Sequence, residues 1–226
     1  MEYWRHGDLW SYILKLKEYL SENAVWRFYI QICLGIYALH SKNILHRDLK
    51  TLNIFLTMDN SVRIGDLGVA TVLNPNGGFL VKKVGTPYYL SPEVCEDKPY
   101  NHKWDIWSLG CILYEIWSLK HPFEAKTQAE LMIKIIKGKY KRIPKTYSKH
   151  LSDMIHWLLT KRSNKRPSIT DIIKDSFFQK KAVQLRIPLP IRPKEVIRPG
   201  DALRLTGGCF DNDDFTMSRK VTLERK

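Results

Sequence analysis

The sequence predicts a mainly α-helical fold. Three observations support this prediction: two apolar patterns that indicate helices and one pattern that indicates a short hairpin. Residues 21–40 carry apolar side chains at the three- and four-residue spacing of one helix face. Residues 103–119 are apolar nearly all round, which indicates a helix buried in the centre of a bundle. Residues 53–64 predict a short hairpin, because two extended runs flank the turn residues Asp59 and Asn60.

The other elements follow in chain order. Ser21 can cap the first long helix, and an extended run at residues 43–45 leads from that helix into a loop. Residues 66–93 are rich in glycine, proline and asparagine, so they predict a long irregular segment of the kind that is functional or mobile. Three further helices are predicted, at about residues 127–136, at 151–159 and from 167 onwards.

The last predicted helix begins with a capping-box pattern formed by Ser168 and Asp171. After Lys180 the apolar pattern decays into a basic stretch that contains several prolines. The sequence therefore predicts two parts, a folded domain at residues 1–180 and a tail at residues 181–226 that is expected to be disordered.

The composition favours a packed intracellular, cytoplasmic domain. Hydrophobic residues make up 44% of the 226 residues, which is enough to bury a core. No apolar run reaches about 18 residues, so no contact with a membrane is expected. The N-terminus has no apolar region typical of a secretory signal. The four cysteines are widely spaced and form no Cys-x-x-Cys pair, so neither a zinc site nor a disulfide framework is predicted. A reducing compartment is therefore expected.

The formal net charge is +14, and one stretch is especially basic. Residues 131–150 contain six lysines and one arginine and no acidic residue. A solvated helix face and loop is the simpler interpretation, and a docking surface for an acidic partner is the alternative. No zinc-finger, ribonucleoprotein or basic-zipper pattern accompanies the charge, so no specific nucleic-acid partner is predicted.

A series of motifs carries the functional signal. Residues 46–53 are His-Arg-Asp-Leu-Lys-Thr-Leu-Asn, and Asp-Leu-Gly follows at residues 66–68. Gly-Thr-Pro-Tyr-Tyr, Ser-Pro-Glu and Asp-Ile-Trp-Ser-Leu-Gly come next, beginning at residues 85, 91 and 105. One such tripeptide is a weak signal, but the whole set in this order and spacing is specific. By these motifs the chain resembles the C-terminal lobe of eukaryotic protein kinases.

Finer features of the motifs point to one branch of that family. Asn53-Ile-Phe-Leu, the leucine of Asp-Leu-Gly and the segment 84–93 resemble the NimA-related kinases. Lys50 and Thr86 resemble serine/threonine rather than tyrosine kinases. The resemblance covers about residues 1–180. It implies a helical bundle with short β-hairpins at the catalytic loop, and transfer of the ATP γ-phosphate to a protein serine or threonine.

The resemblance also implies roles for individual residues. Asp48 is the catalytic base that orients the attacking hydroxyl, and Lys50 contacts the transferring phosphate. Asn53 and Asp66 are oxygen ligands suited to Mg²⁺. The hydroxyl of Thr86 is expected to reach both Asp48 and Lys50. Two supporting contacts are implied as well: Asp105 holds the backbone of the catalytic loop, and Glu93 pairs with Arg166.

The first residues resemble the hinge that binds the nucleotide in protein kinases. By this match, Glu2 and Trp4 supply backbone groups to the adenine of ATP. Asp8 meets the ribose, and Leu9 and Phe55 pack below the adenine ring. ATP and Mg²⁺ are thus the expected cofactors.

The sequence departs from the family before the hinge, because the 226 residues contain no Gly-x-Gly-x-x-Gly loop. The N-terminal β-lobe that covers the nucleotide phosphates is therefore expected to be absent, as in a truncated kinase. Two interpretations remain open. One is a serine/threonine kinase that needs the missing lobe for activity, and the other is a non-catalytic, kinase-like interaction module.

The substrate and the location are predicted only in outline. Val69 after Asp-Leu-Gly is typical of kinases that prefer threonine acceptors, so a protein substrate with threonine preference is expected. The usual phosphorylated residue of the activation segment is replaced by Lys82, which either reflects drift in a variable loop or indicates switching by another route. Association with the cytoskeleton is implied by family analogy, and the oligomeric state is not predicted.

Overall fold

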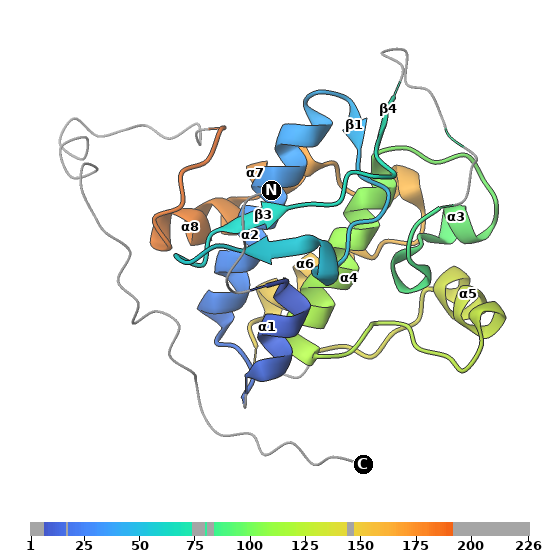
Figure 1. Cartoon of the computed structure of the whole chain (residues 1–226), viewed down its shortest axis with the longest axis horizontal. Coiled ribbons are helices and arrows are strands. Elements are labelled where there is room, and N and C mark those ends of the chain that lie inside the picture. The colour runs from blue at the N-terminus through green and yellow to red at the C-terminus, as the bar shows by residue number, and fades with distance from the viewer. Residues whose placement is uncertain (1–6, 17, 74–79, 81–83, 144–146, 192–226) are drawn as a thin grey trace.

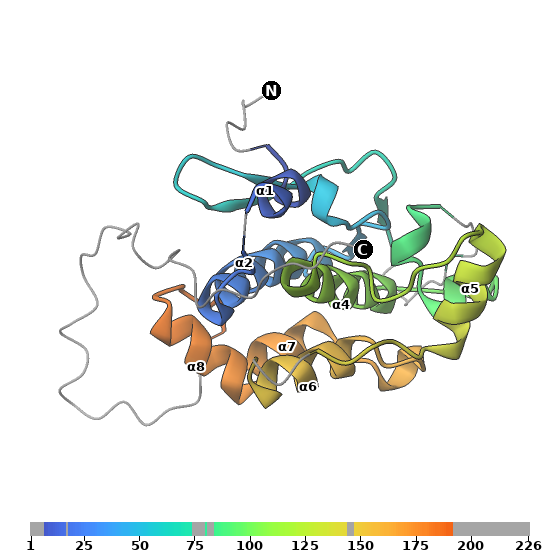
Figure 2. The ribbon, with the colours of Figure 1, turned by 90° about the horizontal axis from the view of Figure 1, so that it is seen from below.

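The computed structural model describes residues 7–16, 18–73, 80, 84–143 and 147–191. Figure 2 shows that their elements form three layers. Two long helices, α2 (Glu22–His40) and α4 (Lys103–Ser118), make the middle layer. The helix α1 (Leu9–Lys15) and the hairpin of β2 (Ile54–Leu56) and β3 (Val62–Ile64) lie on one side. The helices α6 (Lys149–Leu158), α7 (Ile169–Lys174) and α8 (Ser176–Gln184) lie on the other.

The prediction of a mainly helical fold is confirmed. The helix α4 is buried along its length except at Lys103, as the apolar pattern all round predicted. It lies at the centre of the molecule with α2 beside it (Figure 1). The helix α5 (Gln128–Lys137) and the short helix α3 (Pro92–Cys95) pack together at one end of this core.

The predicted caps are present because they depend only on local contacts. The hydroxyl of Ser21 accepts a hydrogen bond from the backbone N–H of Ala24 at 3.2 Å. The capping box is complete as well: the Asp171 carboxylate accepts from the N–H of Ser168 at 2.8 Å, and the Ser168 hydroxyl accepts from the N–H of Asp171 at 3.1 Å. These contacts satisfy N–H groups that the first helical turn leaves unpaired.

The single last helix of the sequence prediction was wrong, since the structure has two helices there. α7 ends at Lys174 and α8 begins at Ser176. Asp175 has an extended ψ of 132°, and its carboxylate accepts from the N–H of Phe178 at 2.9 Å, which caps α8. The break turns Phe178 into the core, where it is fully buried.

Two small antiparallel sheets frame the loop of residues 46–53, which we call the catalytic loop. β1 (Ile44–Leu45) leads into it and pairs with β4 (Thr71–Val72). β2 leads out of it and pairs with β3, which confirms the predicted hairpin. The strand β4 corrects the prediction that residues 66–93 lack regular structure. The helix α3 and the short 3₁₀ turn Pro87–Tyr89 correct it as well.

The end of the predicted domain falls inside a helix. Residue 180 belongs to α8, which continues to Gln184, and three partly buried side chains beyond it pack on the core: Ile187, Leu189 and Ile191. Residues 192–226 of the predicted tail lie outside the described residues. Among the helices of the described residues, none is long and apolar enough to cross a membrane.

Candidate active site

Asp105 fixes the backbone of the catalytic loop from the buried helix α4. Its carboxylate accepts hydrogen bonds from the N–H groups of His46, at 2.9 Å, and Arg47, at 3.1 Å. The ring of His40 lies 2.8 Å from the same carboxylate. Burial alone would raise the pKa of Asp105, but the contact with His40 and the other hydrogen bonds outweigh burial and lower it. The carboxylate thus stays ionised and holds the loop in place.

Arg47 shows why this anchor is needed. Its φ of 68° lies in the left-handed region, which a residue other than glycine rarely adopts. Its Nε atom donates to the carbonyl oxygen of Val69 at 2.6 Å, which ties the catalytic loop to the segment after Asp-Leu-Gly. The hydrogen bonds at its backbone and its side chain therefore offset the cost of the strained conformation.

Asp48, Lys50 and Thr86 form a closed triangle of hydrogen bonds. The ammonium of Lys50 lies 2.7 Å from one oxygen of Asp48 and 2.8 Å from the hydroxyl of Thr86. The hydroxyl of Thr86 donates to the other oxygen of Asp48 at 2.7 Å, and the N–H of Thr86 donates to that same oxygen at 2.9 Å. The structure thus brings together three residues that the family resemblance implied would act together.

The triangle also sets the charge of Asp48. Burial of this half-buried carboxyl would raise its pKa, but the hydrogen bonds from Lys50 and Thr86 together lower it below the usual range. The carboxylate is therefore ionised at neutral pH. Each carboxylate oxygen already accepts two hydrogen bonds, one oxygen from the N–H and the hydroxyl of Thr86 and the other from Lys50 and, at 3.3 Å, from the amide of Asn53. An incoming hydroxyl would take the place of the longest of them, the bond from Asn53.

The predicted magnesium ligands lie on either side of one backbone hydrogen bond. The N–H of Gly65 donates to the carbonyl oxygen of Asn53 at 2.9 Å, so Asp66 is one residue beyond the position opposite Asn53. The amide nitrogen of Asn53 donates to the carbonyl oxygen of Asp48 at 2.9 Å, so the amide oxygen of Asn53 is the atom that would ligate a metal ion. Asp66 is exposed. Two oxygen donors fit Mg²⁺, which commonly takes one or two protein carboxylates and fills its shell with water and phosphate oxygens.

In the described part of the predicted nucleotide site, backbone contacts with β2 hold residues 7 and 8 in place. The backbones of Asp8 and Phe55 form an antiparallel bridge, and the N–H of Leu56 donates to the carbonyl oxygen of Gly7 at 3.1 Å. Phe55 is half-buried and packs over Gly65, where an added Cβ would lie 2.6 Å from the Phe55 ring. The half-buried ring of Phe55 is therefore held where an adenine could pack against it.

Two other predicted contacts look different in the structure. Leu9 has no exposed surface, so it cannot touch the adenine directly and can only support the residues that would. The carboxylate of Asp8 caps α1, accepting from the N–H and from the hydroxyl of Ser11, each at 2.7 Å. Glu2, Trp4 and Lys82 lie outside the described residues.

The pairing of Glu93 with Arg166 is present, as the family resemblance implied. The guanidinium donates to the two carboxylate oxygens at 2.7 and 3.0 Å in a bidentate contact. Arg166 also donates to the carbonyl oxygens of Thr160 and Lys103. This buried pair ties the segment after the Gly-Thr-Pro motif to the helical core.

Sequence reasoning missed a second buried carboxylate, Glu115 of α4. Its side chain accepts hydrogen bonds from the hydroxyls of Thr51, at 2.9 Å, and Tyr89, at 2.5 Å. It thereby joins the catalytic loop to the segment that carries Thr86. Burial raises the pKa of Glu115 to about 7. The available signal was an acidic residue in the middle of a helix that is otherwise apolar all round.

Comparisons with known proteins agree with the geometry. The family model of the protein kinase domain matches residues 1–178. Serine/threonine-protein kinase Nek4 of Mus musculus is 44% identical over 174 residues, which are 76% of this chain and 22% of that protein. Nek1 of Mus musculus is 43% identical over 189 residues, 83% of this chain and 16% of that protein. Nek2 of Homo sapiens is 43% identical over 183 residues, 77% of this chain and 41% of that protein. The matches thus cover less than half the length of these relatives.

Proposed function

Because the chain belongs to the protein kinase family, within its NimA-related serine/threonine branch, we propose that it carries the catalytic half of an enzyme that transfers the γ-phosphate of ATP to a serine or threonine of a protein. The observation that carries this proposal is the triangle of Asp48, Lys50 and Thr86. Such a triangle suits phosphoryl transfer, which depends on positioning and charge neutralisation more than on covalent chemistry.

Each member of the triangle has a distinct part in the proposed reaction. Asp48 accepts a hydrogen bond from the substrate hydroxyl, aims its oxygen at the phosphorus and takes its proton as transfer proceeds. Lys50 lies on the same loop with its ammonium 2.7 Å from the Asp48 carboxylate. From there it can neutralise the negative charge of the phosphoryl group during transfer. Thr86 holds the carboxylate of Asp48 in one orientation through two hydrogen bonds.

The proposed cofactors are ATP and Mg²⁺. Asn53 and Asp66 would hold the metal, which when bound neutralises charge on the phosphate oxygens. Phe55 would support the adenine, with Leu9 beneath it, and Glu2 and Trp4 would supply hinge backbone groups. Asp8 would have to exchange a contact with Ser11 for the ribose.

A kinase assay with a supplied N-terminal lobe tests this function. The 226 residues contain no glycine-rich phosphate loop, so we expect the chain alone to transfer little phosphate. Fusion to the N-terminal lobe of a Nek relative should give transfer to a threonine-containing protein at a rate of order 1–100 per second. Asp48→Asn in the fusion should lower the rate roughly 10²–10⁴-fold.

The same assay separates the kinase from the second candidate, a non-catalytic interaction module. A folded fusion that binds ATP but transfers no phosphate would support the module. A fusion that is active and depends on Asp48 would support the kinase.

The substrate class and the location are proposed more coarsely. A protein substrate with threonine preference follows from Val69, and paired peptides that differ only in serine or threonine would test it. A cytoplasmic location agrees with Cys33 and Cys111, which are buried free thiols. Imaging of a tagged chain would test this location and the association with the cytoskeleton.

A further inference from the structure

A basic groove with a volume of about 370 Å³ lies at the end of the molecule that carries α5. Four lysines line it, Lys134, Lys137, Lys139 and Lys141, and all four are exposed. Glu124 is the one acidic residue among the groove's lining residues. All four lysines come from the stretch 131–150, so the structure places part of this run of charges on a concave surface.

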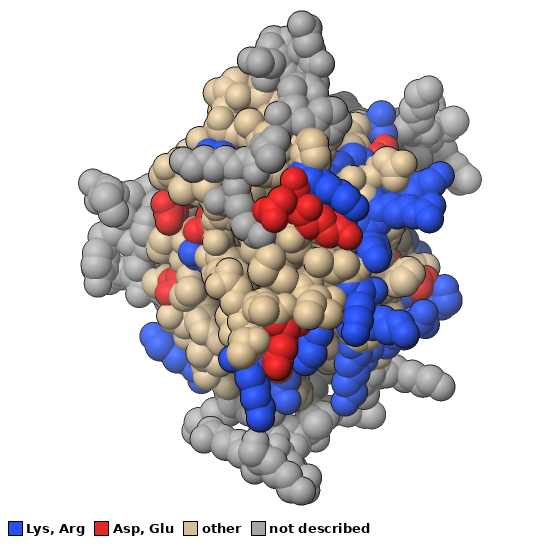
Figure 3. Space-filling model, turned by 90° about the vertical axis from the view of Figure 1, so that its right-hand side faces the viewer, with Lys and Arg blue, Asp and Glu red and all other residues tan. Residues whose placement is uncertain are grey.

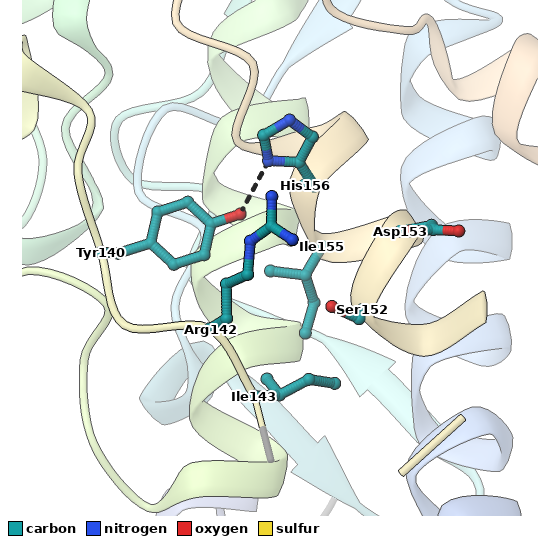
Figure 4. A pocket seen from close by; sticks show the side chains of 7 residues that line it. All are labelled: Tyr140, Arg142, Ile143, Ser152, Asp153, Ile155 and His156. Atoms are coloured by element: carbon teal, nitrogen blue, oxygen red, sulfur yellow. Dashed lines mark hydrogen bonds between the residues drawn. The ribbon is translucent and has the colours of Figure 1, made fainter. Parts of the chain in front are cut away.

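The aromatic wall of this groove is fixed in place. Tyr140 packs edge-on against Phe123, with ring centroids 6.0 Å apart, and Phe123 stacks on Trp107 of the central helix at 5.6 Å. The hydroxyl of Tyr140 turns away toward His156, 3.4 Å from its Nδ1 atom (Figure 4). A segment held by several aromatic contacts does not need to be ordered when a ligand binds, which lowers the entropic cost of binding.

Structural roles account for only part of the positive charge. Lys134 and Lys137 lie in the last turn of α5, where cations stabilise the helix C-terminus, and Lys134 donates to the carbonyl oxygen of Glu124 at 2.6 Å. Lys139 and Lys141 follow the helix cap and have no such role. Within the part of the chain that the structure describes, neither side chain has an acidic partner.

The basic surface continues beyond the groove. Gly138, the C-cap of α5, lies beside Lys161, since an added Cβ would be 3.7 Å from the Lys161 Cβ. Two exposed cations follow Lys161 in the next segment, Arg162 and Lys165. Figure 3 shows basic side chains gathered along one edge of this face of the molecule, with a smaller group of acidic side chains nearby.

We propose that the groove binds an extended, acidic segment of a protein partner. Its carboxylates would pair with Lys137, Lys139 and Lys141, and its chain would lie against the ring of Tyr140. Charge complementarity requires that the partner segment carry negative charge. The concave shape favours a single peptide chain over a flat anionic membrane. The exposed carboxylate of Glu124 on the wall disfavours the continuous polyanion of a nucleic acid.

Binding of labelled peptides to the full chain tests the proposal. The probes are a fluorescein-labelled peptide rich in Asp and Glu, the same peptide with Asn and Gln in their place, a single-stranded RNA, and vesicles that contain phosphatidylserine. The test variant is Lys137→Gln/Lys139→Gln/Lys141→Gln. The matched control is Lys42→Gln/Lys174→Gln/Lys180→Gln, which removes the same charge from exposed sites outside the groove.

We expect the acidic peptide to bind the chain and the control variant with equal affinity, and the groove variant about tenfold more weakly, because exposed ion pairs contribute modestly and three are lost. A photo-crosslinker in the peptide should label the segment around Tyr140. Equal losses in the two variants, binding by the neutral peptide, or tighter binding of RNA or vesicles would each overturn the proposal. So would the absence of binding to the unmodified chain. The readout is binding alone, so the kinase proposal can fail without affecting this result.

Discussion

At the scale of single residues, Thr86 has the most specific position. It reaches Asp48 with its backbone N–H and with its hydroxyl, from 38 residues further along the chain. The hydroxyl also accepts from Lys50. One side chain thus orients the carboxylate of Asp48 and the ammonium of Lys50 together, which backbone contacts alone would not do.

Replacement of Thr86 tests this role through the charge of Asp48. Thr86→Val removes the hydroxyl but keeps the backbone N–H, so the pKa of Asp48 should rise, because the hydrogen bonds lower it in the native state. In the fusion with an N-terminal lobe, phosphate transfer should fall about 10–100-fold, the usual effect of losing a hydrogen bond to a charged group. Carboxyl chemical shifts measured against pH report the pKa without any need for activity.

Thr86→Ser is the matched control, since it retains the hydroxyl. It should keep both the pKa of Asp48 and most of the rate. An unchanged pKa in Thr86→Val would mean that the hydroxyl does not hold the carboxylate, and this interpretation of the triangle would be wrong.

Glu115 gives a prediction about pH and stability. Burial raises its folded-state pKa from an ordinary 4.5 to about 7, so the folded protein holds this proton more tightly than the unfolded chain. The resulting stabilisation is complete below about pH 4.5 and is lost as the pH rises through about 7. Glu115→Gln should remove this loss, which is of order 3 kcal/mol at most, because its amide oxygen can accept the same bonds from Thr51 and Tyr89.

Urea unfolding at a series of pH values measures the effect as the difference between the two proteins. The difference isolates Glu115 from the carboxylates of Asp48 and Asp105, whose lowered pKa values act in the opposite direction. Parallel curves for the two proteins from pH 5 to 8 would show that Glu115 is ionised throughout.

At the scale of elements, two glycines within helices show how closely the layers pack. Gly110 faces α6 from α4, and an added Cβ would lie 2.8 Å from Leu159 and 2.9 Å from the Cβ of Leu158. Gly35 faces the hairpin from α2, and there the near neighbour is the end of the Ile64 side chain at 2.6 Å. The first neighbour is held close to its backbone, whereas the second can rotate away.

Alanine at the two glycines should therefore give opposite outcomes. Gly110→Ala should destabilise the protein by about 1–3 kcal/mol, because the α4–α6 contact must open. Gly35→Ala should be neutral or stabilising by up to about 1 kcal/mol, since alanine favours the helix and Ile64 can adjust. Thermal unfolding of both variants measures the difference. Equal effects would show that helix propensity rather than packing decides at both positions.

The elements also show which parts of the fold a sequence can predict. The caps at Ser21 and Ser168 depend on neighbours three residues away, so the pattern alone was enough. The strand β4 depends on Ile44 and Leu45, which lie far back in the chain, and its two residues carry no local signal. The break at Asp175 exists because Phe178 needs to face the core, which is a tertiary demand.

The site divides in the same way. Asp48, Lys50 and Asn53 share one loop, so their motif was visible, but the approach of Thr86 and the pairing of Glu93 with Arg166 came only from resemblance to a family. Glu115 was missed because a single acid on an apolar helix has no partner within reach in the sequence. Its partners, Thr51 and Tyr89, meet it only after the chain folds.

At the scale of the whole molecule, the net charge of +14 sets the response to salt. The like charges repel one another most in the compact state, and salt screens that repulsion. Salt also weakens exposed ion pairs such as Lys98–Glu96 and Lys149–Asp153, but such pairs contribute little. The buried pair of Arg166 and Glu93 is screened much less. Salt should therefore stabilise the folded chain, because it screens the repulsion more than it weakens the ion pairs.

The midpoint of thermal unfolding should consequently rise when NaCl increases from about 0.01 M to about 0.15 M, over which the screening length falls from about 30 to about 8 Å. The groove variant and its control, each with three fewer positive charges, should both show a smaller rise than the unmodified chain. Choline chloride should act like NaCl, because screening depends on ionic strength rather than on the identity of the ion. A midpoint that falls with salt would mean that attractive pairs outweigh the repulsion, and it would place the stabilising electrostatics at the surface instead of in the buried contacts of Asp105 and Arg166.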